Sequence, residues 1–194
     1  MNNIFNHNIL ILGDGFLGSG IKSYLNNEFN LIVINRKKIN SLLSSPKIFL
    51  QYINRHKIKI IFNCIGNSKK CLDFNDYIEP NIKVPLKILY ILSNKKVTFI
   101  NFSSQDEAKV DKYFENKKSP RGNIYNYAIS KSIFTRILKE NFYNNYIINF
   151  RIPVIYGSNS PNHMLYGDAL EKYTLKKFFL IKNPNYLNNF IHIH

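Results

Sequence analysis

The sequence predicts an α/β fold with a doubly wound parallel sheet that carries helices on both faces. Three observations predict it: short apolar runs recur along the 194 residues, segments of helical length separate them, and a glycine-rich turn follows the first run. Parallel strands need a crossover connection, so strands that alternate with helices of about 10 to 15 residues indicate a parallel sheet. With 45% hydrophobic residues and no linker-like stretch, residues 1–194 are predicted to form one domain.

The predicted strands are short and rich in isoleucine, valine and phenylalanine. They cover residues 9–12, 31–34, 59–64, 97–102 and 146–152. Helices are predicted from residue 16 onward and over 47–56, 81–93 and 127–141. Ser45 and Pro46 suit the N-cap and the first position of the second of these helices. A further strand is expected after 31–34, and residues 39–43 are a poor candidate for it.

The charge of the chain bears on its partners. The formal net charge is +15, but the lysines are scattered among asparagine and isoleucine, as an A/T-rich coding sequence would produce without selection for binding. The sequence contains no basic cluster, aromatic platform or nucleic-acid motif, so nucleic-acid binding is not expected. A basic surface attracts acidic ligands such as a dinucleotide or a nucleotide-sugar equally well.

Several features favour a reducing cytoplasmic location without a membrane. No apolar stretch approaches the roughly 20 residues that span a bilayer, and residues 1–7 lack the cationic start of a signal peptide. Cys64 and Cys71 are too few for a disulfide framework or a four-cysteine zinc site. His192 and His194 alternate along one face, but we interpret them as end-of-strand residues and expect no metal site.

The glycine-rich turn has the spacing of a dinucleotide-binding loop. Gly13, Gly15 and Gly18 follow the apolar run 9–12 and precede a helix that starts near Phe16. In this arrangement the first glycine permits the tight turn, the second lets the backbone approach a pyrophosphate, and the third allows close helix–strand packing. The phosphates rest on the helix N-terminus, where free N–H groups favour an anion. Glycines also mark ordinary tight turns, so the motif alone is weak.

A tyrosine and a lysine four residues apart offer acid–base chemistry. Tyr127 and Lys131 share one face of the predicted helix, and a nearby ammonium lowers the pKa of a phenol. Two other pairs, Tyr113/Lys117 and Tyr173/Lys177, have the same spacing. Position favours Tyr127, which follows a strand that ends at Ser103 and Ser104.

Taken together, these segments resemble the extended short-chain dehydrogenase/reductase family, which comprises nucleotide-sugar epimerases, dehydratases and ketoreductases. The matching segments fall in the order of the family and span nearly the whole chain. They are 13–18, 63–66, Asn81, 102–104, 127–131, 151–157 and 189–194. The resemblance implies a Rossmann-like domain.

The resemblance also implies catalytic roles. Tyr127 would give or take the proton at the substrate oxygen, and Lys131 would bind the nicotinamide ribose and lower the pKa of Tyr127. Ser104 would hydrogen-bond the reacting oxygen, with Ser103 in that role if the alignment slips by one residue. A plainer interpretation is that both serines only end a strand and cap a turn. For Arg151 the plainer interpretation is a charge at a strand end.

The remaining matched positions would contact the cofactor. The expected contacts besides Lys131 are Gly13, Gly15, Phe16, Leu17, Gly18, Cys64, Ile65, Gly66, Asn81, Pro153, Val154 and Ile155. Of these, 153–155 would lie beside the nicotinamide ring, and Cys64 would be a small buried residue and not a nucleophile.

The end of the second strand predicts the choice of cofactor. NAD-preferring sites place a carboxylate there for the ribose hydroxyls, whereas an arginine accommodates the 2′-phosphate of NADP. This chain has Asn35, Arg36 and Lys37 there, and Arg36 offers a planar bidentate donor. We therefore expect NADP(H) to be favoured over NAD(H). The alternative is a solvated basic turn.

Two features depart from the family. Residues 42–44 lack the acidic residue that usually contacts the adenine, and family members are longer, with a C-terminal domain that holds the nucleotide-sugar. We expect that substrate-binding domain to be largely absent here, which would fit a fragment, a stopped gene product or a naturally short relative. His163 follows residues 151–157 and could touch a substrate, although a solvated loop residue is the plainer interpretation.

The sequence therefore predicts an NADP(H)-dependent ketoreductase or epimerase that acts on a nucleotide-activated sugar. Hydride would pass to or from nicotinamide C4 while Tyr127 moves the proton. In the family, a dehydratase needs an acidic residue directly after Ser104. Gln105 stands at that position and slightly disfavours a dehydratase. The alternative is a catalytically idle dinucleotide-binding module or a truncated remnant of such an enzyme.

Association is a further expectation. The family resemblance suggests a homodimer through the Tyr127 helix and the helix that begins near Asn81. The Tyr127 helix carries more apolar side chains than one buried stripe requires, namely Ile129, Ile133, Phe134 and Ile137.

Overall fold

The computed structural model describes residues 8–69, 73–110, 123–142, 146–178 and 190–193, and for 123–125 only the backbone. Three residues or pairs that the sequence singles out lie outside these ranges: Cys71, Tyr113/Lys117 and His194. Within the described residues, no helix combines the length and apolar character needed to cross a bilayer.

A five-stranded sheet forms the centre of the molecule, in the order β2-β1-β3-β4-β5. Every neighbouring pair is parallel. The strands are β1 (Asn8–Leu12), β2 (Asn30–Ile34), β3 (Ile58–Asn63), β4 (Thr98–Ser104) and β5 (Ile147–Ile152). The strands predicted over 9–12, 31–34, 59–64, 97–102 and 146–152 are thus all present, and the predicted parallel α/β sheet is confirmed.

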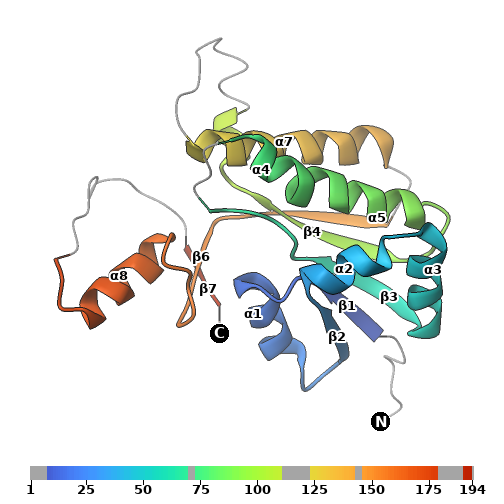
Figure 1. Cartoon of the computed structure of the whole chain (residues 1–194), viewed down its shortest axis with the longest axis horizontal. Coiled ribbons are helices and arrows are strands. Elements are labelled where there is room, and N and C mark those ends of the chain that lie inside the picture. The colour runs from blue at the N-terminus through green and yellow to red at the C-terminus, as the bar shows by residue number, and fades with distance from the viewer. Residues whose placement is uncertain (1–7, 70–72, 111–122, 143–145, 179–189, 194) are drawn as a thin grey trace.

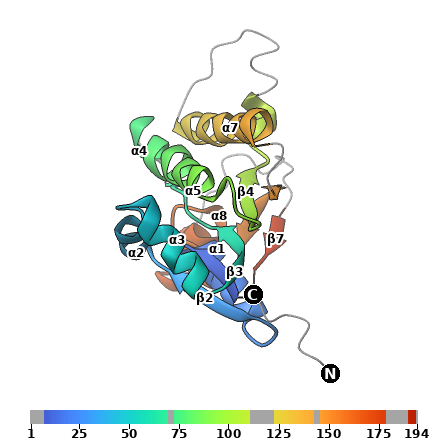
Figure 2. The same cartoon turned by 90° about the vertical axis from the view of Figure 1, so that its right-hand side faces the viewer.

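Helices connect the strands and cover the sheet (Figures 1 and 2). They are α1 (Phe16–Leu25), α2 (Arg36–Leu42), α3 (Pro46–Arg55), α4 (Asn75–Ile78), α5 (Val84–Leu92) and α7 (Asn123–Asn141). A wide π-helical turn, η1 (Glu79–Lys83), joins α4 to α5. The chain steps from β1 to one edge of the sheet and later returns past β1, so right-handed crossovers place α1 on one face and α3, α5 and α7 on the other.

The segment after β2 differs from the prediction. Residues 39–43 do not form a strand, because α2 occupies this stretch and β2 remains the edge of the sheet. The Asn35 side chain caps α2 by accepting the backbone N–H of Lys38 at 2.9 Å. Ile39 and Leu42, three residues apart, then face the core. An N-cap and helical spacing therefore decided the structure of a segment that looks apolar enough for a strand.

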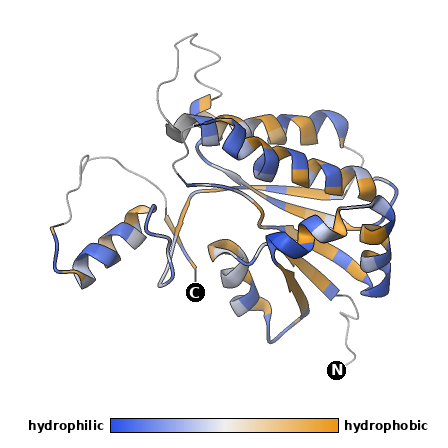
Figure 3. Ribbon diagram, in the orientation of Figure 1, coloured by the Kyte–Doolittle hydropathy of each residue, from blue (hydrophilic) through white to orange (hydrophobic). Residues whose placement is uncertain are grey.

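The core lies between the central strands and the helices. β1 is buried almost throughout, with Leu10, Ile11 and Leu12 fully buried. Phe49 of α3, Leu89 of α5 and Phe134 of α7 pack into the same core. Figure 3 shows apolar residues concentrated on the strands and alternating with polar residues along the helices. Central strands of a parallel sheet are buried on both faces, which explains the continuous apolar run in β1.

The chain leaves the main sheet after β5. Pro153 separates β5 from β6 (Val154–Tyr156), which pairs in parallel with β7 (Phe190–His192) in a second small sheet. Between them α8 (Leu165–Thr174) stands apart from the other helices, at the left of Figure 1. Ile193 packs so closely on Gly20 of α1 that a β-carbon on that glycine would lie 2.2 Å from it. The C-terminal part of the described chain therefore returns to the first helix.

Candidate functional site

The turn between β1 and α1 lies at the carboxyl end of the sheet. Gly13 has φ +103°, in the left-handed region, and its N–H donates to the carbonyl oxygen of Ile34 at 2.9 Å. A β-carbon on Gly13 would lie 2.9 Å from the carbonyl oxygen of Cys64. The turn is therefore held between the ends of β2 and β3, and both the conformation and the space require glycine.

The next two glycines have different surroundings. Gly15 is the N-cap of α1 and makes no side-chain cap, and no atom of the protein lies within 4 Å of the place where its β-carbon would be. Gly18 is the opposite case, since its β-carbon would clash with the backbone of Gly13. Phe16 and Leu17, half-buried, begin the helix. The helix N-terminus is thus open above Gly15 and tightly packed behind Gly18.

The sheet register brings other predicted residues to the same end. Leu12 pairs with Ile34 on one side and with Asn63 on the other, so the segments that start at Gly13, Asn35 and Cys64 leave the sheet together. Asn35, Arg36 and Lys37 form the exposed start of α2. Open α/β sheets bind ligands in the crevice at the carboxyl ends of their strands.

Asn81 fastens the loop after β3. Its Oδ1 accepts the backbone N–H of Asn67 at 2.8 Å, and its Nδ2 donates to the hydroxyl oxygen of Ser130 at 2.9 Å. Ser130 in turn donates to the carbonyl oxygen of Tyr127 at 2.7 Å. Asn81 lies in the wide turn η1, and such turns occur frequently at functional sites. One buried amide therefore connects the loop after β3 with the helix that carries Tyr127.

Gly66 lies beside this amide and beside Lys131. A β-carbon on Gly66 would be 3.2 Å from Oδ1 of Asn81 and 3.6 Å from Nζ of Lys131. Ile65 is buried, and the half-buried Cys64 has a free thiol. Burial raises the pKa of the Cys64 thiol to about 12, so the thiol is neutral at physiological pH and is not an activated nucleophile.

Ser104, Tyr127 and Lys131 meet where β4 ends. Lys131 donates from Nζ to the carbonyl oxygen of Phe102 at 3.0 Å, and the same Nζ lies 5.9 Å from the centre of the Tyr127 ring. The side chains of Ser104 and Tyr127 are hydrogen-bonded to each other. The Tyr127/Lys131 pair and the strand-end serine, 23 residues or more apart in sequence, are therefore neighbours in space.

The electrostatics of this group differ from the simple expectation. Burial raises the pKa of Tyr127 to about 12, against a smaller lowering by the Ser104 hydrogen bond. Burial also lowers the pKa of Lys131 to about 8, against the raising effect of Glu107 and Cys64. In the protein alone, desolvation of the phenol outweighs the effect of Ser104, and the charges of Asp106 and Glu107 raise the pKa further, so Tyr127 is a protonated phenol at neutral pH.

The structure separates the other candidates. Ser103 shares a hydrogen bond of 3.1 Å with Thr135, one turn of α7 after Lys131. Tyr173, whose spacing to Lys177 matches equally well, is 84% exposed on α8. His163 lies 3.2 Å from the Ser68 hydroxyl. Pro153, Val154 and Ile155 form the half-buried passage from β5 to β6.

Sequence reasoning missed one residue at this end of the sheet. Glu107 is fully buried, and its carboxylate accepts hydrogen bonds from Thr135 and Arg151, both at 2.9 Å. Its partners lie 28 and 44 residues further along the chain, and no local pattern pairs them. The one available signal was a carboxylate three residues after Ser104.

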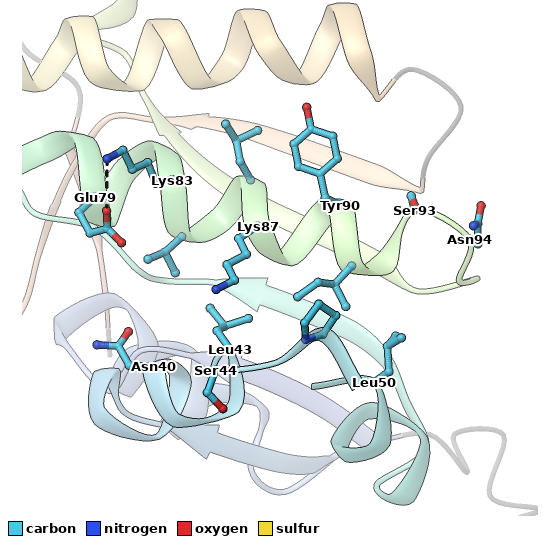
Figure 4. A pocket seen from close by; sticks show the side chains of 14 residues that line it. Asn40, Leu43, Ser44, Leu50, Glu79, Lys83, Lys87, Tyr90, Ser93 and Asn94 are labelled. Atoms are coloured by element: carbon cyan, nitrogen blue, oxygen red, sulfur yellow. Dashed lines mark ion pairs between the residues drawn. The ribbon is translucent and has the colours of Figure 1, made fainter. Parts of the chain in front are cut away.

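A large groove lies elsewhere, between α2 and α3 on one side and η1 and α5 on the other (Figure 4). Its volume is about 1040 Å³. Leu43, Ser44, Lys83, Lys87 and Tyr90 are among the residues that line it. None of the predicted site residues takes part. In the part of the chain that the structure describes, no three histidine, cysteine or acidic side chains gather as metal ligands would.

Comparisons with known proteins identify the fold. No model of a protein family matches the sequence, and a search of curated proteins gives no match. The structure is similar to that of dTDP-glucose 4,6-dehydratase from Bacillus anthracis in complex with NAD. The TM-score is 0.72 at 16% identity, over 96% of this chain and 68% of that chain. The chain has the α/β fold of that enzyme.

Two further structures agree with this assignment. ADP-L-glycero-D-manno-heptose-6-epimerase from Helicobacter pylori gives a TM-score of 0.72 at 18% identity, over 99% of this chain and 71% of that chain. GDP-mannoheptose C4 reductase from Campylobacter jejuni, with NADP bound, gives 0.66 at 17% identity, over 90% and 59%. The predicted Rossmann-like fold and the resemblance to the extended short-chain dehydrogenases/reductases are confirmed at the level of the fold. The dehydratase structure contains NAD and the reductase structure contains NADP, and this chain spans 59 to 71% of the length of the three enzymes.

Proposed function

We propose that the chain binds a nicotinamide dinucleotide at the carboxyl end of the sheet and acts as an NADP(H)-dependent ketoreductase or epimerase on a nucleotide-activated sugar. The observation that carries this proposal is the meeting of Ser104, Tyr127 and Lys131 at the end of β4. The three residues lie at the same end of the sheet as the glycine turn. A glycine turn that served only to reverse the chain would not require an acid–base group at the same end of the sheet.

The glycine turn fits the pyrophosphate of such a cofactor. The space above Gly15 is open, and the N-terminus of α1 carries no acidic residue in its first turn and no side-chain cap. Backbone N–H groups there can donate to phosphate oxygens. Gly66 beside Asn81 and Lys131 would border the ribose and the nicotinamide, which supplies hydride chemistry when bound.

The acid–base residues then have distinct tasks. Tyr127, protonated at neutral pH, donates its proton to a carbonyl oxygen of the sugar as that carbon is reduced. In the reverse direction it accepts the hydroxyl proton, and a protonated Lys131 favours the phenolate that this requires. Ser104, already bonded to Tyr127, hydrogen-bonds the same substrate oxygen.

The start of α2 supports a preference for NADP(H). Arg36 and Lys37 are exposed there, and the first turn of α2 has no acidic residue that would repel a 2′-phosphate. Arginine binds phosphate oxygens in a bidentate manner. Lys47, an exposed cation at the start of α3, offers a matched control.

Titration with NADPH and NADH, followed by nicotinamide fluorescence, tests the binding proposal. We expect NADPH to bind more tightly, Arg36→Ala to remove the difference, and Lys47→Ala to preserve it. If neither nucleotide binds the folded protein, the proposal is wrong. If both bind equally in all three proteins, the start of α2 is a solvated basic turn.

Turnover of 4-keto nucleotide-sugars tests the catalytic proposal. We expect NADPH oxidation or epimerised product with the wild type, and a loss of at least about 100-fold in Tyr127→Phe because the acid–base group is gone. The second candidate is an idle dinucleotide-binding module, in which Ser104, Tyr127 and Lys131 have no catalytic task. Binding without turnover, unaffected by Tyr127→Phe, would establish that second candidate.

We further propose a homodimer formed through α7 and α5. Ile129, Ile133 and Ile137 of α7 are half-buried, and Tyr90 on the adjacent α5 is 62% exposed. Phe134 does not contribute, because it is buried in the core of its own chain. Light scattering at tens of micromolar should give the mass of a dimer. A monomeric mass would contradict this arrangement.

A further inference from the structure

Glu107 is a carboxylate with no exposure to solvent. It lies three residues after the end of β4 and begins the helical residues 107–110. Burying a charged carboxylate is unfavourable unless strong partners replace the lost water. A charged carboxylate at this position therefore needs strong hydrogen-bond or ion-pair partners.

Three segments supply the partners. The Thr135 hydroxyl of α7 donates to one carboxylate oxygen, and Nε of Arg151 on β5 donates to the other, each at 2.9 Å. Burial raises the pKa of this carboxyl, against the lowering effects of Thr135, Arg151 and the Ser104 backbone at the end of β4. Glu107 thus joins two strand ends to the helix that carries Tyr127 and Lys131.

The helix geometry makes this link specific. Tyr127, Lys131 and Thr135 are spaced by four residues, so they lie on one face of α7 in successive turns. Thr135 is further fixed by Ser103 at 3.1 Å and by Nδ2 of Asn149 at 3.1 Å. A carboxylate that is hydrogen-bonded to Thr135 therefore fixes the position of α7 along its own axis and its rotation about that axis, both relative to the end of β4.

We propose that Glu107 is a positioning residue of the acid–base group, which holds the Ser104 backbone and the Tyr127/Lys131 face of α7 in register and presents its negative charge to Lys131. This inference rests on the proposed function. Because its side chain is fully buried, Glu107 acts through Ser104 and Lys131.

The charged surroundings give this role a distinctive signature. Lys131 faces Glu107 after β4, Cys64 after β3 and the ring of Tyr127 on its own helix. Glu107 faces Lys131 and, from β5, Arg151. A negative charge near a buried ammonium favours its protonated form. Neutralising Glu107 should therefore lower the pKa of Lys131, which the loss of a merely structural hydrogen bond would not do.

The test compares Glu107→Gln with Glu140→Gln, an exposed control on α7. The Lys131 pKa is followed by NMR of its side-chain carbon in the protein without cofactor. We expect a fall of about one pH unit in Glu107→Gln and no change in Glu140→Gln. An unchanged value in a folded Glu107→Gln protein would overturn the proposal.

A second variant decides the matter if Glu107→Gln does not fold. Arg151→Gln removes the cation that faces Glu107 and leaves the carboxylate in place; its side chain is 44% exposed. We expect the Lys131 pKa to rise, and an unchanged value would again overturn the proposal. Because this readout needs no cofactor, it is independent of NADPH binding by the wild type, whose failure would instead contradict the proposed function.

Discussion

The carbonyl oxygen of Gly13 lies so close to Gly18 that a β-carbon on Gly18 would be only 2.0 Å from it. The first turn of α1 can therefore approach the β1 turn only because residue 18 has no side chain. Behind the same position lies a methyl group of Ile11, 3.4 Å from that point. Neither backbone nor core can move aside without disturbing β1.

We expect Gly18→Ala to lower the free energy of unfolding by about 1–3 kcal/mol or more, because an added methyl group meets backbone atoms. Urea denaturation measures the change. Stability equal to that of the wild type would mean that α1 moves away from the turn more easily than its packing indicates.

Gly15→Ala should leave the stability of the protein unchanged and weaken the binding of NADPH. No protein atom lies near the added methyl group, so stability should stay within about 0.5 kcal/mol of the wild type. Under the proposed function the methyl group would obstruct the pyrophosphate, and NADPH affinity should fall at least tenfold in the fluorescence titration. Unchanged affinity would remove Gly15 from the proposed site.

Asn81→Leu should destabilise the protein by about 1–3 kcal/mol, because it leaves the backbone N–H of Asn67 and the hydroxyl of Ser130 without this partner. The loop after β3 should also lose protection against hydrogen exchange. Asn94→Ala, at an exposed position, is the control and should change neither quantity. Equal exchange rates in the two variants would show that the amide does not fasten this loop.

Lys131→Met should change how stability depends on pH. The pKa of Lys131 is about 8 in the folded protein, against 10.5 when exposed, so between these values the unfolded chain binds more protons. Lys131 therefore makes the free energy of unfolding rise with pH in this window, by at most about 1.4 kcal/mol per pH unit, and contributes no slope well below pH 8. Above pH 9 the raised pKa of Cys64 acts in the opposite direction.

Urea denaturation between about pH 7.5 and 9 should thus show a steeper rise for the wild type than for Lys131→Met. Lys139→Met, an exposed lysine on the same helix, should follow the wild type. Parallel curves for all three proteins would mean that Lys131 is better solvated than its burial indicates.

The strands and most helices could be predicted because their signals are local. Ser45 accepts the backbone N–H of Lys47 at 3.3 Å, and α3 begins at Pro46, as the Ser-Pro pair predicts. The apolar run of β1 indicates a central strand. Residues 39–43 were ambiguous by composition alone, and the cap at Asn35 decided in favour of a helix.

Much of the candidate site could be named from the sequence, but its connections could not. Ser104, Tyr127 and Lys131 were identified by order and resemblance. The amide of Asn81 reaches Ser130 across 49 residues, and the carboxylate of Glu107 reaches Arg151 across 44. Such contacts depend on which strands become neighbours, and no periodic pattern along the chain records that.

The pairing of Glu107 with Arg151 also has a consequence for synthesis on the ribosome. Translation delivers β4 and its buried carboxylate well before β5, so a nascent chain that ends short of residue 151 holds Glu107 without its arginine. Until Arg151 is available, the carboxylate can bind Thr135 of α7 but lacks its cation. The full set of side-chain partners of Glu107, and the pairing of β4 with β5, is therefore complete only after β5 has emerged from the exit tunnel.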